Sequence, residues 1–357
     1  MKTTNRIKFV FFGVLLFVLI SGGCASVKIY RDNFNPERIE GPPYPDVSFA
    51  VMTDLHIWHP SLGSPSDPAY QRATRNDGKL LQESIELLDN AISVIIDAGV
   101  SFVLVCGDLT KDGELYNHEV LSEKLKRLSD ANIKVMVIPG NHDIYSGNAT
   151  RLTGNMGWGL PSVSYTKFSE IYYEYGFSQA IMRDSDSLSY VTEPVDGLWV
   201  LSIDSNRYRD KPRSWNTLGD GRIRPLTVSW IAEVLNEAQI QNKSVIAMMH
   251  HRLVPYEGVT QERMEFYLVR DYESVGELLA SWNVRVIFTG HNHNQSINRA
   301  SFGDKYIVDI QTGSLIAGDC PFRIVDIKDN VMNISSHSAR IDQPVTVSDQ
   351  YFNNIAF

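Results

Sequence analysis

The stretch "IKVMVIPGNHD" (residues 133–143) carries the pattern that decides the fold. A run of apolar, largely β-branched residues ends in Pro-Gly, which is turn punctuation, and Asn141, His142 and Asp143 follow at once. An apolar run of this kind indicates a strand buried on both faces. The polar tripeptide by itself would be an ordinary solvated loop, so its meaning depends on what the rest of the chain brings to the same place.

Four other segments share this design. Each is an apolar run that ends in Asp, His or Asn: "VSFAVMTDLH" (47–56), "VSFVLVCGDLT" (100–110), "KSVIAMMHH" (243–251) and "VRVIFTGHNH" (284–293). Further strands are predicted over 198–205, 306–314 and 322–329. The segments therefore predict a sheet-rich core with polar side chains at the strand ends.

Amphipathic stretches with apolar residues at helical spacing lie between these runs, over 80–99, 118–132 and 224–240. Gly99 suits a helix C-terminus and Pro225 suits a first helical turn. Strands that alternate with helices predict an α/β layered core. Residues 144–196 break the alternation and are rich in Gly, Ser, Tyr and Asn. We expect them to form a lid-like insertion.

In open α/β sheets, ligands bind beyond the carboxyl ends of the strands. The five runs would deliver a set of polar residues to that edge: Asp54, His56, Asp108, Asn141, His142, Asp143, His250, His251, His291 and His293. Carboxylate and amide oxygens mixed with imidazoles suit divalent Zn, Mn or Fe. The set exceeds what one ion needs, and two ions that share a bridging carboxylate would use it.

The motifs "DLH" (54–56), "GDLT" (107–110), "GNHD" (140–143), His250 and "GHNH" (290–293) occur in this order, each after an apolar run. In this the chain resembles the calcineurin-like metallophosphoesterase superfamily. The resemblance implies a four-layer α/β/β/α sandwich with a dinuclear metal site at the strand C-terminal ends, over residues 46–357.

The resemblance also implies a role for each matching residue. Asp54, His56 and His293 would hold the first metal, Asp108 would bridge, and Asn141, His250 and His291 would complete the second. A bridging hydroxide would attack phosphorus. His142 would contact the phosphoryl group or protonate the leaving oxygen, with Asp143 orienting its imidazole. Because the proline after the fourth motif is delayed to Pro255, His251 stays open as an alternative to His250.

The substrate class follows from finer features. Protein phosphatases of the superfamily carry an arginine in a GDxxDRG pattern, and "GDLTKDG" (107–113) has none. The stretches "GDLTKDGELYNHE" (107–119) and "RDSDSLSYVTEP" (183–194) resemble class III cyclic-nucleotide phosphodiesterases and their exported bacterial relatives. We therefore expect a phosphodiesterase that acts on small phosphodiesters such as cyclic nucleotides. A phosphomonoesterase acting on nucleotides is the alternative, and the complete ligand set disfavours a non-catalytic binding lipoprotein.

The N-terminal segment predicts export. Lys2, Arg6 and Lys8 precede an apolar run over 9–20, which is too short to span a bilayer comfortably and suits a signal peptide. The small residues Ser21, Gly22 and Gly23 follow and directly precede Cys24. This order resembles a bacterial lipoprotein signal. We expect residues 1–23 to be removed, a lipidated Cys24 to anchor the protein to a membrane of the cell envelope, and 24–45 to be a tether.

Composition limits the partners. The chain has 357 residues, 43% of them hydrophobic, and a formal net charge of −9. Loss of the three basic residues in the signal would make the mature chain still more acidic. An acidic surface disfavours long nucleic acid as a partner. Cys106 and Cys320 lie far apart in the sequence and form no disulfide framework, and Cys106 is expected to be a buried free thiol.

Overall fold

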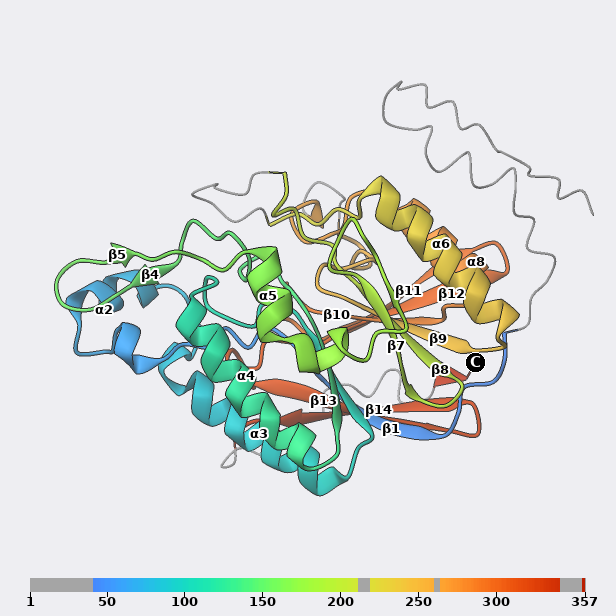
Figure 1. Ribbon diagram of the computed structural model, residues 1–357, viewed down its shortest axis with the longest axis horizontal. Helices are drawn as coiled ribbons and strands as arrows, with labels where there is room; N and C mark the ends of the chain where they lie inside the picture. The colour runs from blue at the N-terminus through green and yellow to red at the C-terminus, as the bar shows by residue number, and fades with distance from the viewer. Residues whose placement is uncertain (1–40, 211–218, 260–263, 341–354, 357) are drawn as a thin grey trace, which may run out of the picture. The chain divides into compact units, whose positions relative to one another are not determined.

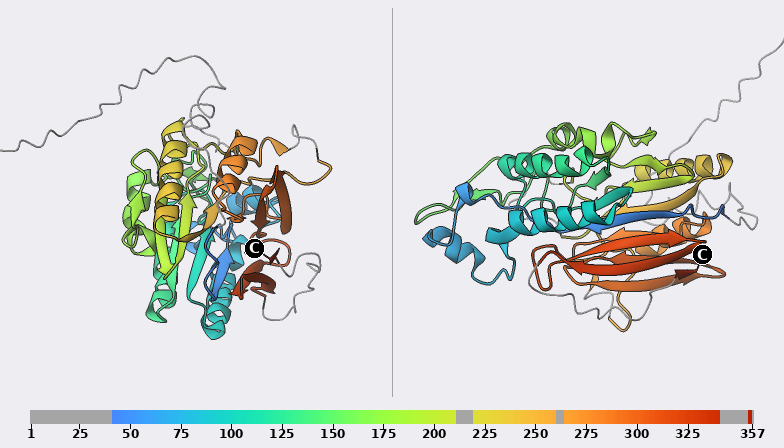
Figure 2. Two further views of the ribbon diagram at one scale, coloured as in Figure 1. Left: turned by 90° about the vertical axis from the view of Figure 1, so that its right-hand side faces the viewer. Right: turned by 90° about the horizontal axis from the view of Figure 1, so that it is seen from below.

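The computed structural model describes residues 41–210, 219–259, 264–340 and 355–356 of the chain. Its first sheet has the strand order β15-β14-β13-β1-β2-β3 (Figure 1). Strands β1 (Val47–Met52), β2 (Phe102–Cys106) and β3 (Lys134–Ile138) run parallel. The C-terminal strands β13 (Pro321–Lys328), β14 (Val331–Ser338) and β15 (Ile355–Ala356) extend the sheet with antiparallel pairing. Figure 2 shows the red C-terminal strands beside the blue β1.

The second sheet has the order β11-β12-β10-β9-β8-β7-β6. Its parallel centre consists of β8 (Leu198–Ile203), β9 (Ser244–Met249), β10 (Val286–Thr289) and β12 (Lys305–Gln311). Strands β6 (Met182–Arg183), β7 (Tyr190–Val195) and β11 (Ser296–Phe302) close its edges with antiparallel pairs. Strands β11 and β12, which follow residue 294, therefore belong to the second sheet of the sandwich.

Helices cover the two sheets from opposite sides. Figure 1 shows α3 (Ser84–Ala98) and α4 (Leu115–Asp130) on one side of the strands, and α6 (Pro225–Ile240) and α8 (Tyr272–Ser281) on the other. This arrangement is the predicted α/β/β/α sandwich. Gly99 ends α3 with a left-handed φ of 65°, and Pro225 opens α6, both as expected. Helix α8 was not predicted from the sequence.

The packing explains why the strands are apolar throughout. In β8, Leu198 and Val200 pack in the core that contains the first sheet, whereas Trp199 and Leu201 pack with α6 and α8. Successive side chains of a strand point to opposite faces, so a sheet covered on both sides needs apolar residues at every position. Phe49 links the two sheets, since its ring stacks on Phe102 at 4.6 Å and meets the edge of Phe288 at 5.4 Å, both measured between ring centroids.

The segment 144–196 contains β4 (Thr150–Arg151), β5 (Trp158–Gly159), α5 (Tyr165–Ile171), the π-helical turn η3 (Tyr173–Phe177), β6 and β7. Strand β7 pairs with β8 on both sides of a register shift between Thr192 and Val195, so the last part of the predicted insertion belongs to the second sheet. The β4–β5 hairpin is bound to α2 (Pro68–Thr74) and its N-cap. Ala69 N donates to Gly154 O at 2.9 Å, and Gly154 N donates to the Asp67 carboxylate at 2.6 Å.

The predicted signal peptide, Cys24 and most of the tether lie outside the described residues. In the described part of the chain, no helix combines the length and the apolar character needed to cross a membrane. Cys106 and Cys320 are buried free thiols, as expected for Cys106.

Candidate metal centre

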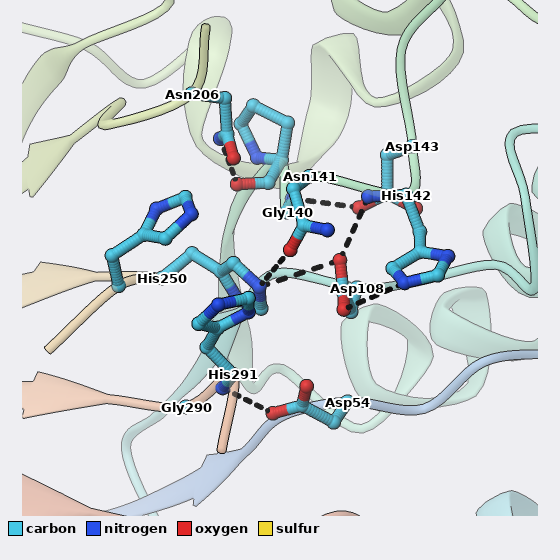
Figure 3. Close-up of polar contacts among 12 residues, drawn as sticks. Asp54, Asp108, Gly140, Asn141, His142, Asp143, Asn206, His250, Gly290 and His291 are labelled. Carbon is cyan, nitrogen blue, oxygen red and sulfur yellow. Dashed lines mark hydrogen bonds and ion pairs between the residues drawn. The ribbon is translucent and has the colours of Figure 1, made fainter. Parts of the chain in front are cut away.

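The loops after five strands bring the predicted polar residues together, where strands of both sheets end (Figure 3). The first sheet supplies Asp54 and His56 after β1, Asp108 after β2 and Asn141 after β3, and the second sheet supplies His250 after β9 and His291 and His293 after β10. Because these strands run parallel within each sheet, their carboxyl ends share one edge.

A first cluster consists of Asp54, His56, Asp108 and His293, whose ligand atoms lie within 4.8 Å of one another. Nε2 of His56 and Nε2 of His293 are 3.1 Å apart, and Asp54 Oδ1 lies 3.2 Å from His293 Nε2. His56 Nε2 lies 3.6 Å from Asp108 Oδ2. Two imidazole nitrogens and two carboxylates thus face a common point, as the ligands of one divalent ion do.

A second cluster shares Asp108 with the first and adds His250 and His291. His250 Nε2 lies 3.3 Å from Asp108 Oδ1 and 3.1 Å from the amide oxygen of Asn141, which completes the group (Figure 3). Asp108 turns Oδ2 toward His56 and Oδ1 toward His250. Its carboxylate is therefore placed to bridge two ions.

The hydrogen bonds behind these side chains leave the facing atoms free for a cation. His250 donates from Nδ1 to Cys106 O at 2.8 Å, and His291 donates from Nε2 to Phe266 O at 3.3 Å, so the lone pair of the other ring nitrogen faces inward. Buried Asp54 Oδ1 and His291 Nδ1 have no hydrogen-bond partner in the described structure. Orphaned lone pairs of this kind are costly unless a cation satisfies them, so the residues present fit divalent metals.

Most of the ligand residues share an unusual backbone conformation. Asp54, His56, Asp108, His291 and His293 have positive φ values of 52°, 39°, 49°, 74° and 56°. Such a conformation is uncommon outside glycine and persists only where the surroundings impose it. Bonds between loops do so here, since Asp54 N donates to Gly107 O at 3.0 Å and His56 N donates to Asp108 O at 2.9 Å.

The glycines of two motifs allow the loops to approach. A Cβ on Gly140, which precedes Asn141, would collide with the backbone and carboxylate of Asp108. A Cβ on Gly290, which precedes His291, would collide with the side chains of Thr53 and Asp54. The sequence pattern Gly followed by a polar residue therefore reflects close contact between neighbouring loops.

His142 stands beside the clusters without belonging to either. Its Nε2 lies 4.0 Å from Asp108 Oδ2, while Nδ1 donates to Asp112 Oδ1 and Lys111 O, both at 2.8 Å. Burial disfavours its charged form, but the Asp108 and Asp112 carboxylates outweigh burial and raise the pKa of His142 to about 9. His142 can therefore be protonated on Nε2 at neutral pH.

The predicted orienting role of Asp143 is not what the structure shows. The Asp143 carboxylate accepts from the backbone N–H groups of Leu109, Thr110 and Gly140, at 2.8–3.0 Å, and from the Thr110 hydroxyl. It fastens the "GDLT" loop to the "GNHD" loop, and Asp112 orients His142 instead. Asp112 was not predicted as a site residue, although a carboxylate four residues after Asp108 is visible in the sequence.

The structure also separates His250 from His251. His250 lies in the second cluster. His251 instead shares a hydrogen bond between its Nδ1 and Ser205 Oγ, 2.8 Å apart, and its ring packs against that of His291 with centroids 4.6 Å apart.

The shared residue Asp108 is ionised. Burial opposes ionisation of Asp108, but the imidazoles of His250, His142 and His56 hold its pKa well below the usual range. The bridging position therefore carries a negative charge.

Fold and site together define two adjoining clusters that could each hold a divalent ion, at the end of an α/β/β/α sandwich. The chain belongs to the calcineurin-like phosphoesterase family, because the model of that family matches residues 47–295. Membership implies a phosphoric ester hydrolase that uses divalent metals. The matched range includes both clusters, His142 and Asp112.

Two solved structures share the fold. A dimetal phosphatase from Danio rerio is 14% identical, with a TM-score of 0.58 over 83% of this chain and 98% of that chain. A purple acid phosphatase from yellow lupin (Lupinus luteus) seeds is 13% identical, with a TM-score of 0.51 over 85% of this chain and 54% of that chain. Identities this low show the fold alone. The search of curated proteins returned no match.

Proposed function

We propose that this protein is a dinuclear metal-dependent phosphodiesterase for small diesters, with cyclic nucleotides among the candidate substrates. One divalent ion would be held by Asp54, His56 and His293. The other would be held by Asn141, His250 and His291, and Asp108 would bind both ions. Two such ions polarise the phosphoryl group and make a water nucleophilic near neutral pH. Mn, Fe and Zn all suit this donor set.

The proposed role of His142 follows from its two ring nitrogens. The Nδ1 proton is held by two acceptors, Asp112 Oδ1 and Lys111 O. The charged ring can therefore donate only its Nε2 proton to a substrate. As the bond from phosphorus to the leaving oxygen breaks, that proton would pass to the oxygen. The ring is then neutral, and its remaining proton stays on Nδ1, hydrogen-bonded to Asp112 Oδ1.

The observation that favours diesters is the pairing of the cations beside His142. Lys79 forms an ion pair with Asp77 at 3.2 Å, and Lys111 forms one with Asp112. The Lys79 charge acts on the site, since burial first and Lys79 second hold the pKa of His56 well below its usual value. Because both cations are already paired with carboxylates, they contribute less to binding the second negative charge of a monoester than unpaired cations would. A diester carries only one.

An apolar surface beside the second cluster suits the organic group of a diester. The Phe266 side chain is 56% exposed although its ring stacks on that of His291, with centroids 5.9 Å apart. An aromatic face at this place can contact an ester substituent. Nucleotide monoesters, the alternative substrate class, would make the same contact with Phe266. They differ from diesters in carrying a second negative charge on the phosphate.

The test is a comparison of two substrates. We expect the full-length chain, purified in detergent, stripped of metal and reloaded with Mn²⁺, to hydrolyse bis(p-nitrophenyl) phosphate at least about 10-fold faster than p-nitrophenyl phosphate. Asn141→Ala, which removes an oxygen from the second cluster, should lose the activity and serves as the control for contaminating enzymes. Faster monoester turnover would replace the phosphodiesterase by a phosphatase. Absence of both activities with two ions bound would favour a non-catalytic binding protein.

We further propose that the protein is an exported lipoprotein, anchored to a cell-envelope membrane through a lipidated Cys24. The support is the sequence alone: a basic start, an apolar run over 9–20 and small residues before the cysteine. Expressed in bacteria, the wild type should sediment with membranes and incorporate labelled palmitate. Cys24→Ser should lose the label, whereas Cys106→Ser should keep it. A labelled Cys24→Ser variant would contradict the proposal.

A further inference from the structure

The loop after β9 contains a buried arginine two residues from His250. Arg252 is fully buried and lies across the β11–β12 pair. Its Nη1 donates to Ser296 Oγ at 2.7 Å and to Gln311 Oε1, and its Nη2 donates to Asn298 Oδ1 at 2.9 Å. Ser296 and Gln311 are directly opposite in the sheet register. The two strands therefore present a polar platform on which the guanidinium rests.

The direct partners of this cation are neutral, and the buried Asp309 carboxylate nearby accepts instead from Leu253 N and Val254 N, at 2.8 and 2.9 Å. Nε and Nη2 donate to Val254 O at 3.1 and 2.8 Å, and the guanidinium stacks on the Tyr256 ring, 3.9 Å from its centroid. Arg252 has no ion pair within the described ranges, and its donors are engaged by oxygens instead. Because a buried charge is costly when such partners are lost, the guanidinium fixes the path of residues 252–256 against the sheet.

The same platform reaches the "GHNH" loop. Gln311 Nε2 donates to Gly290 O at 3.1 Å, while Gln311 Oε1 accepts from the Tyr256 hydroxyl at 2.8 Å. The Tyr256 hydroxyl in turn accepts from Asn292 Nδ2 at 2.8 Å. Asn292 stands between His291 and His293, so this chain of bonds ties the segment after His250 to the loop that carries His291.

We infer that Arg252, Tyr256 and Gln311, together called the Arg252 clamp, are positioning residues for the second metal. The clamp joins the two segments that supply the two imidazoles of the second cluster, His250 and His291. Its bonds reach Gly290 and Asn292 of the loop that carries both His291 and His293, and within the described residues none reaches the side chain of a first-cluster residue. The clamp sets the distance between His250 and His291, and therefore the affinity for the second ion. This inference rests on the dimetal centre and is independent of the substrate.

The test measures metal binding. Tyr256→Phe removes the hydroxyl that joins Asn292 to Gln311 and keeps the ring under Arg252. Tyr44→Phe is the matched control, since it removes a buried hydroxyl bond to Val245 O (3.0 Å) next to the start of β9, at the end away from His250. In Mn²⁺ titrations of the full-length chain, we expect Tyr256→Phe to weaken the second ion about 10-fold and the first less than 2-fold. The electron paramagnetic resonance signal of the coupled Mn²⁺ pair should appear at correspondingly higher Mn²⁺.

Arg252→Lys provides the second variant. It keeps the charge and loses the planar fork and the stacking, so it should show the same selective loss or a larger one. Unchanged binding of both ions in Tyr256→Phe, or equal weakening of both, would overturn the inference. These outcomes concern metal binding only, so a failure of the phosphodiesterase proposal would leave them unaffected.

Discussion

Replacing Asp108 with asparagine should lower kcat/KM for bis(p-nitrophenyl) phosphate by about 1,000-fold or more and reduce the bound Mn²⁺ to one ion or none. Asp108 is the residue common to both clusters, with one oxygen toward His56 and the other toward His250. An amide has nearly the same shape, but it carries no charge and offers only one good ligand oxygen. A pair of ions contributes several kcal/mol to the transition state, and each 1.4 kcal/mol is about tenfold in rate.

Metal analysis and steady-state kinetics on the same preparation check this prediction. Asp89→Asn is the matched control, because Asp89 is a surface carboxylate of α3 paired with Lys124 and Arg127. Its activity should stay within about 2-fold of the wild type, since exposed ion pairs contribute little. If Asp108→Asn kept two ions and more than a tenth of the activity, the bridging role would be wrong.

His142→Ala should have the next largest effect, and its size should depend on the leaving group. We expect a loss of about 100- to 10,000-fold with a diester that releases an alkoxide, because that oxygen needs a proton as the bond breaks. With p-nitrophenolate, a much better leaving group, the loss should be smaller by at least about 10-fold. Both ions should remain bound, since His142 belongs to neither cluster. Equal losses with the two leaving groups would exclude the acid role.

Two carboxylates near His142 extend this test. Asp112→Asn removes the negative charge of one of the two acceptors of Nδ1, a charge that helps to raise the pKa of His142. The folded enzyme should then lose the His142 proton at lower pH, so the alkaline limb of the kcat profile should move to lower pH. Asp143→Asn is the control: it weakens bonds to Leu109, Thr110 and Gly140 and should lower the melting temperature more than it moves that limb.

The sequence by itself determined the strand ends and the polar residues placed there. Apolar runs such as 47–52 and 134–138 can be recognised as doubly covered strands because both faces of each are buried. Parallel strands end at a common edge, so Asp54, Asp108 and Asn141 could be placed together without coordinates. The α/β/β/α layering followed from the family resemblance. Helix α8 was not predicted, although Asp271 directly before it is a residue type that N-cap positions favour.

Only the tertiary structure decided which neighbour of each key residue faces the site. Asp143 is adjacent to His142 in the sequence, yet its carboxylate turns to the backbone of a different loop, and Asp112 reaches the imidazole. His250 and His251 are adjacent and differ in role because successive side chains at a strand end point to opposite faces. The Arg252 clamp depends on the pairing of β11 with β12, far along the chain. Hydrophobic periodicity specifies the faces and ends of strands, whereas the direction of a loop side chain is set by long-range hydrogen bonds that form only in the folded protein.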